Sequence, residues 1–309
     1  MTGGEIRLTQ AVESYVALRR ATGFAFRSEG SLLQSFAAFS DAIGQPYVCT
    51  ETAIEWARSA PSLSQRARRL GQVIRFARYT RAEDQHHEIP PPVFGSESRP
   101  RPVPYIFSKE NIQRLVQAAS ELGRRNAFRG HTYSTLFALL ACTGLRVSEA
   151  IGLCFQDITA DGLVIRCSKF RKSRLVPLHE TAQAGLERYL HRRRAYTALD
   201  DHVFVSLRRR PLLLRDAETA FHEAIDKIGL PRTPGRPRPT IHSLRHSFAV
   251  RALEACPDGR DRITKHMLAL STYLGHSKVA DTYWYLEATP ELMRNIADSC
   301  QSFFTGGRP

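Results

Sequence analysis

The chain has 309 residues, of which 42% are hydrophobic and 24% charged, a composition typical of globular protein, and its length allows two domains. Lys and Arg number 44 against 30 Asp and Glu, and the resulting net charge of +14 favours a polyanionic partner such as nucleic acid. No stretch approaches the ~18 apolar residues of a membrane span, and the N-terminus lacks the apolar core of a secretion signal, so we expect a cytoplasmic protein with no membrane contact.

Residues 1–88 read as an all-helical domain. Apolar residues recur at helical spacing on both sides of Thr22-Gly23, which predicts two helices with a break at that dipeptide. The second apolar stripe stops at Gly44. Thr50 has the side chain of an N-cap and is expected to begin a short third helix.

A fourth predicted helix in this domain carries an unusual number of cations. Its apolar face is formed by Leu70, Val73, Ile74 and Ala77. Six arginines occupy the rest: Arg66, Arg68, Arg69, Arg75, Arg78 and Arg81. One or two arginines would indicate an ordinary solvated face, but six with little acid to balance them favour a surface that follows DNA phosphates. We select Arg66 and Arg69 as DNA-binding residues.

Proline punctuates the next segment, 89–104, and predicts an extended, semi-rigid linker. A second domain is expected over 105–309, with Ser108 as the N-cap of its first helix. Two short apolar runs, 163–165 and 175–178, flank a polar turn and predict a β-hairpin among the helices. The predicted fold class is therefore mainly α with a small antiparallel sheet in the second domain.

Two arginines of this domain lie in apolar surroundings. Arg146 lies in the run Thr-Gly-Leu-Arg-Val-Ser-Glu, and Arg245 lies between Leu244 and an apolar run. Guanidinium groups match the geometry of a phosphodiester and stay charged at any working pH, so two of them at one phosphate can replace a metal ion. Glu149, three residues after Arg146, is expected to orient that arginine.

A histidine accompanies the second arginine. His242 precedes Arg245 by three positions, so both lie on one helical face, where a histidine can exchange protons near neutral pH. His246 falls near the same face. The alternative interpretation, in which His242 and His246 bind a metal, lacks the glutamate of the H-E-x-x-H motif.

Two further candidates lie near the C-terminus. His276 and Tyr285 are nine positions apart, on opposite faces of any straight helix, so a helix break is expected if both face one phosphate. Asp281-Thr282 offers an N-cap that would place Tyr285 near the start of a new helix. Tyr283 competes with Tyr285 for the role of nucleophile.

The predicted hairpin turn is rich in cations. A lysine there can protonate a leaving alkoxide, and Lys169 and Lys172 are both candidates. The plainer interpretation is a basic hairpin that only touches the DNA backbone, which makes Arg171, Lys172 and Arg174 candidate DNA-binding residues.

The order of these motifs resembles the tyrosine recombinases, the family of phage integrases and Xer-type recombinases, and looks like integrases carried by mobile elements. Four boxes carry the resemblance: T-G-L-R-V-S-E, the hairpin ending in R-L-V-P-L, H-S-L-R-H, and L-G-H-S. The resemblance implies a two-domain DNA clamp that works as a tetramer on two duplexes, without metal or other cofactor and with no small-molecule substrate.

The resemblance also implies a role for each candidate. Tyr285 would attack the scissile phosphate, giving a 3′-phosphotyrosyl bond and a free 5′-hydroxyl. Arg146, Arg245 and His276 would stabilise the pentacovalent phosphorus. His242 would be the base towards Tyr285, and Lys169, the first lysine of the turn, the acid for the leaving oxygen. A serine, Ser168, stands where the family has a glycine before this lysine.

Three other functions compete with strand exchange. A DNA-binding protein of this fold that no longer cuts is disfavoured, because every expected catalytic residue type is present. A metal-dependent nuclease would use His242, His246 and His276. A type IB topoisomerase would share the chemistry but differ in outcome.

Overall fold

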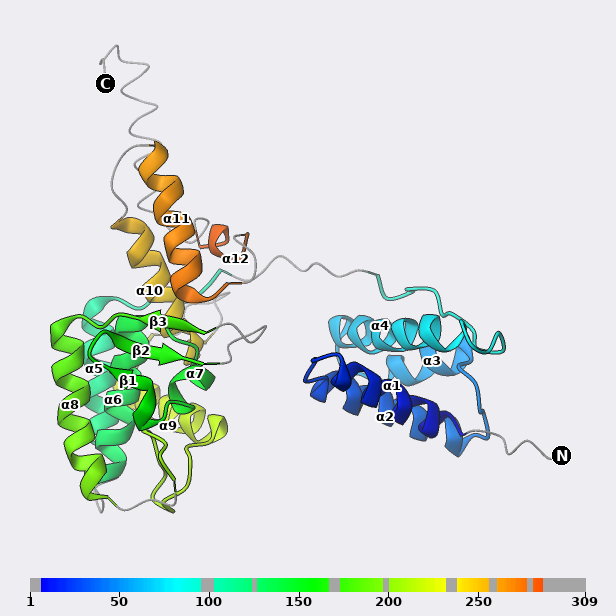
Figure 1. The fold of residues 1–309 in the computed structure, drawn as a ribbon, viewed down its shortest axis with the longest axis horizontal. Helices are drawn as coiled ribbons and strands as arrows, with labels where there is room; N and C mark the ends of the chain where they lie inside the picture. Colours follow the sequence, from blue (N-terminus) through cyan, green and yellow to red (C-terminus); the bar gives the residue numbers. More distant parts are fainter. Residues whose placement is uncertain are drawn as a thin grey trace, which may run out of the picture. The chain divides into compact units, whose positions relative to one another are not determined.

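The computed structural model describes residues 7–95, 103–123, 127–166, 173–196, 200–231, 238–255, 260–276 and 280–285. The chain divides into two compact units, Met1–Arg101 and Pro102–Pro309 (Figure 1). The fold is mainly helical, with a small antiparallel sheet in the second unit, which confirms the predicted fold class. Over the described ranges, no helix is both long and apolar enough to cross a membrane.

The N-terminal unit consists of α1 (Leu8–Ala21), α2 (Arg27–Ala42), α3 (Thr50–Arg58) and α4 (Leu63–Thr80). Their apolar stripes meet in one core that includes Leu33, Phe36, Trp56, Leu70 and Phe76. Predicted helices and observed helices agree, and Gly23 and Gly44 adopt the left-handed conformation beyond the ends of α1 and α2.

The expected cap of α3 was wrong by one residue. Cys49 is the N-cap and contributes no side-chain bond, while Thr50 is the first helical residue. The Thr50 N–H instead donates to the carboxylate of Glu88, 2.7 Å away. A distant acid thus takes the place of a local cap.

The second unit contains short strands and a larger set of helices. The helices are α5 (Lys109–Ser120), α6 (Ala127–Thr143), α7 (Val147–Ile151), α8 (Glu180–Ala195), α9 (Leu214–Ile228), α10 (His242–Glu254), α11 (Arg260–Leu274) and α12 (Ala280–Tyr283), with a 3₁₀ turn, η1 (Phe155–Asp157). Ser108 caps α5 as predicted, because its hydroxyl accepts the Asn111 N–H at 3.1 Å.

The sheet has the order β1 (Ile158–Thr159), β2 (Gly162–Ile165) and β3 (Arg174–Val176), with both pairs antiparallel. Leu163 pairs with Val176, and Ile165 pairs with Arg174. The predicted hairpin is therefore confirmed as β2 and β3. Strand β1 was not predicted, because two residues are too short to show the alternation of a strand.

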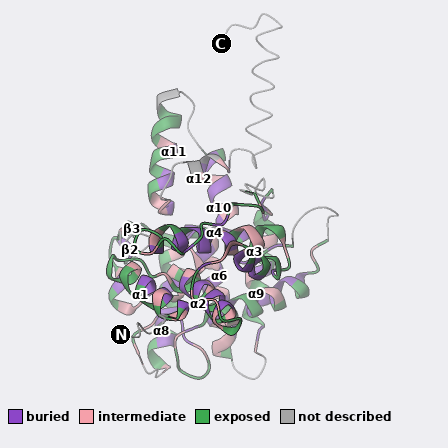
Figure 2. Ribbon diagram, turned by 90° about the vertical axis from the view of Figure 1, so that its right-hand side faces the viewer, coloured by how far each residue is buried: buried purple, intermediate pink, exposed green. Residues whose placement is uncertain are grey.

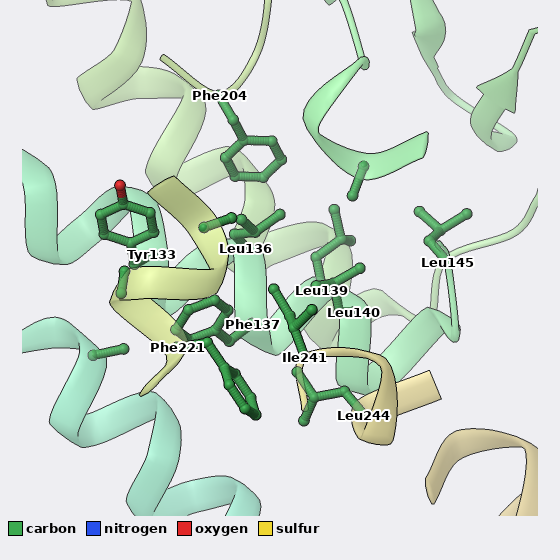
Figure 3. Packing of buried hydrophobic residues seen from close by; sticks show 14 of the residues in the cluster. Tyr133, Leu136, Phe137, Leu139, Leu140, Leu145, Phe204, Phe221, Ile241 and Leu244 are labelled. Atoms are coloured by element: carbon green, nitrogen blue, oxygen red, sulfur yellow. The ribbon is translucent and has the colours of Figure 1, made fainter. Parts of the chain in front are cut away.

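Helix α6 is the centre of the second unit's core (Figure 3). Leu136, Phe137 and Leu140 on α6 are essentially inaccessible to solvent, and Phe221 of α9 packs against them. Burial of each such side chain contributes about 1.5–3 kcal/mol. Figure 2 shows the resulting pattern, with buried and exposed residues on different faces of the outer helices.

Leu145 and Leu244 belong to this same core (Figure 3). Each directly precedes one of the two arginines selected from the sequence, Arg146 and Arg245. The apolar context noted in the sequence therefore anchors the backbone of both arginines in a close-packed interior, where small displacements are costly.

A smaller apolar cluster lies between α10, α11 and the turn that follows α12. Its buried members are Ala249, Val250, Leu253, Met267, Leu270, Leu274 and Tyr285. The aromatic ring of Tyr285 is thus part of the packing that joins these helices, and its position depends on them.

Candidate active site

Arg245 lies in the first turn of α10 and is only 2% exposed. Its Nη1 donates to the carbonyl of Gly144 at 2.6 Å, and its Nη2 donates to the carbonyl of Leu274 at 2.7 Å. These carbonyls lie just past the end of α6 and at the end of α11. Burial, and then the nearby charge of Arg146, lowers the pKa of Arg245 to about 10, so the group stays cationic at neutral pH.

Arg146 is the N-cap of α7, and its side chain is 28% exposed. Its Nη1 donates to Glu149 Oε1 at 2.8 Å, and its Nη2 donates to the carbonyl of Gly275 at 2.9 Å. Glu149 Oε2 also accepts the backbone N–H of Arg146 at 3.0 Å. The contact expected between Glu149 and Arg146 is therefore present.

Hydrogen bonds to backbone carbonyls that are far away in the sequence hold the two arginines in place. Arg245 donates to the glycine before Leu145, and Arg146 donates to the glycine before His276. Both glycines are left-handed, with φ of 61° at Gly144 and 66° at Gly275. A Cβ on Gly144 would lie 2.4 Å from the Phe248 ring, so the site requires glycine there for space as well as conformation.

Arg174, at the start of β3, joins the same network. Its Nη1 and Nη2 donate to the two oxygens of Glu149 at 3.1 and 2.8 Å, and its Nε donates to the carbonyl of Tyr273 at 2.8 Å. Burial alone would raise the pKa of Glu149, but the bonds from Arg174 and Arg146 outweigh it, and the pKa lies below its usual value. Such a placement is not what we expected of Arg174, which the sequence suggested as a DNA-backbone contact.

His276 follows Gly275 at the end of α11 and is half-buried. Its Nδ1 lies 2.7 Å from the hydroxyl of Thr282 in α12. Burial, and then the charges of Arg245 and Arg146, lowers its pKa to about 4. The ring is therefore neutral at physiological pH and close enough to both arginines to sense their charge.

His242 begins α10 and responds to the same two arginines. Burial by the surrounding protein, and then the charges of Arg245 and Arg146, lowers its pKa to about 4, although the residue as a whole is exposed to solvent. A neutral imidazole beside two guanidinium groups is able to accept a proton.

His246 is the histidine that contacts the tyrosine. Its Nδ1 lies 3.2 Å from the Tyr285 hydroxyl, and its ring packs edge-on against those of His242 and Trp284. Burial, then His242 and Arg245, lowers its pKa to about 3. The sequence indicated only that His246 lies near the face of His242. The signal for it is a spacing of one helical turn from His242, and the only role that the sequence suggested for His246 is that of a metal ligand.

His276 and Tyr285 do not share one straight helix, as expected, but the first helix ends before His276 and not between the two residues. Helix α11 ends at Leu274, and α12 covers only Ala280–Tyr283. The expected position of Tyr285 near the start of a helix was wrong, since it lies in the turn after α12, where its N–H donates to the Thr282 carbonyl at 3.0 Å. The Thr282 hydroxyl contacts His276.

Several predicted residues lie away from this network or outside the described part of the chain. Lys169, Arg171 and Lys172 fall in 167–172, outside the described residues. Among the residues that the structure does describe, no group of three or more His, Cys, Asp or Glu is arranged to hold a metal ion.

The arginines of α4 divide into two sets. Arg66 donates from Nε to the Ala60 carbonyl at 2.8 Å, and Arg69 bonds Ser59 Oγ at 2.8 Å with its guanidinium over the Trp56 ring. Both thus hold α4 to the end of α3. Arg68, Arg75 and Arg78 are exposed on the same helix, which leaves them available to a partner.

We expect the second unit to lose stability as the pH falls from about 6.5 towards 4. His246 and His276 titrate near pH 3 and 4 in the folded chain, whereas an unfolded histidine binds its proton near 6.5, so the unfolded state takes up more protons in that window. Urea unfolding at pH 7 and pH 5, followed by Trp284 fluorescence in a Trp56→Phe background, measures this.

His246→Gln should weaken the pH dependence, because it removes one of the depressed groups. The exposed His86→Gln variant, in the other unit, should leave it unchanged. An unfolding midpoint equal at both pH values would contradict the burial of neutral histidines.

The chain is similar to known proteins over nearly its whole length. The model of the phage integrase family matches residues 106–291. “Putative integrase/recombinase y4rB” of Sinorhizobium fredii is 41% identical over 295 residues, which cover 92% of this chain and 94% of that protein. Tyrosine recombinase XerC of Halalkalibacterium halodurans is 28% identical over 279 residues, covering 87% and 84% of the two chains.

Solved structures share the fold. XerH site-specific recombinase, in a post-cleavage complex with palindromic difH substrate, aligns with a TM-score of 0.67 at 18% identity, covering 94% of this chain and 84% of that one. A lambda integrase tetramer bound to a Holliday junction aligns with a TM-score of 0.61 at 17% identity, covering 88% and 77%. The chain belongs to the phage integrase family and is a site-specific DNA recombinase of the tyrosine type.

Proposed function

We propose that this recombinase cuts DNA by attack of the Tyr285 hydroxyl on a phosphodiester, through a 3′-phosphotyrosyl intermediate. The observation that carries the proposal is the meeting of Arg146 and Arg245, both fixed by backbone carbonyls, with neutral histidines and Tyr285. The charges of Arg146 and Tyr285 both act on the pKa of Arg245, which supports their closeness.

The scissile phosphate is proposed to lie against Arg146 and Arg245. In the transition state, negative charge grows on the non-bridging oxygens, and guanidinium groups already fixed in place stabilise it without further reorganisation. His276 adds a neutral N–H donor, oriented by Thr282. Because Arg245 is nearly buried and Arg146 only partly exposed, their interaction with phosphate is screened less than that of surface cations.

The proton and the leaving group each need a partner. The Tyr285 Oη–P bond forms and the P–O5′ bond breaks. We assign the tyrosine proton to His242, which stands beside both arginines, and we assign to His246 the holding of Tyr285 in the absence of DNA. Lys169 is proposed to protonate the leaving 5′ oxygen, with Lys172 as the alternative.

The remaining assignments concern partners and domains. We propose that residues 1–88 bind DNA, that 89–104 link them to a catalytic domain over 105–309, and that the protein acts in the cytoplasm as a tetramer on double-stranded DNA. The exposed arginines of α4 support DNA contact by the first domain, since phosphate neutralisation supplies sequence-independent affinity. No metal or cofactor is assigned.

A covalent trap tests the proposed chemistry. A target duplex, selected from random sequences by binding, is nicked next to the cleavage position so that a short strand is lost after attack. The protein should then accumulate as a covalent DNA adduct in the presence of EDTA. Cleavage that requires added metal and leaves no adduct would refute the mechanism. Specific binding without cleavage would favour a DNA-binding protein that no longer cuts.

A further inference from the structure

Arg174 stands at the base of the hairpin, where β3 begins and pairs with Ile165 of β2. Despite this position at the edge of a basic turn, its side chain is only 11% exposed. Three hydrogen bonds take its guanidinium inward, two to Glu149 and one to the Tyr273 carbonyl. A residue that meets a DNA backbone would keep its donors towards solvent, so these contacts call for another explanation.

The first consequence concerns Arg146. The Glu149 carboxylate is 8% exposed and lies between two guanidinium groups, with Oε1 accepting from Arg146 Nη1 at 2.8 Å and from Arg174 Nη1 at 3.1 Å. A buried carboxylate that loses one of two cations is left with an uncompensated charge. Glu149 therefore holds Arg146 in one orientation only while Arg174 holds Glu149.

The second consequence concerns the segment that carries His276. Gly275 packs against Arg174 so closely that a Cβ there would lie 2.8 Å from Nη1. The carbonyl of the same glycine accepts a bond from Arg146 Nη2. Arg174 thus touches the carboxylate that orients Arg146, and also the backbone just before His276.

We propose that Arg174 is a positioning residue, which sets the geometry of Arg146 and His276 without contacting DNA. The inference rests on the proposed function, because it assumes that these two side chains meet the scissile phosphate. The bidentate geometry with Glu149 explains why arginine is needed, since a lysine ammonium is a point charge that cannot bond both carboxylate oxygens and the Tyr273 carbonyl in the same fixed geometry.

The test compares Arg174→Lys and Arg174→Met with a matched control. Arg166 lies at the other end of the hairpin, just after β2, pairs with Asp157 at 2.5 Å and has a side chain that is 55% exposed. Arg166→Met removes one hairpin charge without touching the site. For each protein, DNA affinity is measured at several salt concentrations, and the single-turnover rate of adduct formation is measured at saturating DNA.

A second substrate makes the measurement specific to the arginine clamp, which is the pair Arg146 and Arg245 proposed to hold the phosphate. In a methylphosphonate, a methyl group replaces one non-bridging oxygen, so the group is neutral and depends less on aligned guanidinium groups. On the phosphodiester, we expect both Arg174 variants to react about 10- to 100-fold more slowly than wild type, the scale of a misaligned site. On the methylphosphonate, the difference in rate between variant and wild type should be smaller. The affinity of the variants for DNA and its salt dependence should equal those of wild type.

The possible outcomes separate the alternatives. The inference would be overturned if the Arg174 variants bound DNA more weakly, with a slope of log affinity against log salt lower by about one, but formed the adduct at the wild-type rate at saturating DNA. Arg174 would then be a phosphate contact. An equal deficit on both substrates would also overturn it, because the effect would not pass through the arginine clamp. The double variant Glu149→Gln/Arg174→Met should slow adduct formation by a smaller factor than the product of the factors for the two single variants. Absence of an adduct from wild type would refute the proposed function instead.

Discussion

Tyr285→Phe is expected to abolish the covalent DNA adduct while leaving DNA binding intact. The substitution removes the attacking oxygen, and no neighbouring atom on that ring can replace it. The phenyl ring keeps its place in the apolar cluster with Leu253 and Leu274. The contact with His246 is lost, which alters stability by about 1 kcal/mol. Adduct formation on the nicked duplex, with binding measured on the intact duplex, checks both parts.

Tyr283→Phe is the matched control, since it removes a hydroxyl two positions earlier in the same aromatic run. We expect it to keep the adduct. The reverse result, an adduct from Tyr285→Phe that disappears in Tyr283→Phe, would move the nucleophile and contradict the proposed site.

Arg245→Lys is expected to slow adduct formation by about 10²- to 10³-fold at saturating DNA, the usual loss when one fixed donor to a developing oxyanion is removed. Lysine keeps the charge but cannot reproduce a planar fork that bonds Gly144 and Leu274 together. Each carbonyl left buried without a partner costs about 1–3 kcal/mol, so the free energy of unfolding should fall as well. Single-turnover rates and urea unfolding measure the two effects.

Arg251→Lys on the same helix is the control for the loss of stability expected of Arg245→Lys. Arg251 also donates to a backbone carbonyl, that of Phe107 at 2.7 Å, but it is not part of the network around Glu149. It should lower stability without a comparable loss of rate. If Arg245→Lys were as active as wild type once folded, Arg245 would be a structural residue and the phosphate would lie elsewhere.

Local features of the chain were predictable because their signals lie within a few residues. The helices of the first unit follow from apolar spacing and from the glycines that end them. The bond between Arg146 and Glu149 follows from a spacing of three. The separation of His276 and Tyr285 onto different elements follows from helix geometry if both face one site, since nine residues on one helix point two side chains apart.

Contacts between distant segments could not be derived in this way. Arg245 is 101 positions from Gly144, and Arg146 is 129 positions from Gly275, so their exchange of bonds appears only in the folded chain. The charge of Arg174 suggested a surface role, but Glu149, 25 positions away, draws its side chain inward. The predicted cap of α3 was wrong for the same reason, because the Thr50 N–H bonds to Glu88, which no local sequence motif indicates.

Whether Tyr285 carries the DNA during strand exchange can be decided by locating the covalent bond. The adduct trapped in EDTA is digested with protease and nuclease, and the modified peptide is sequenced by mass spectrometry. We predict a nucleotide joined through its 3′-phosphate to the Tyr285 oxygen. Attachment to any other residue, or cleaved DNA with no modified peptide, would contradict it.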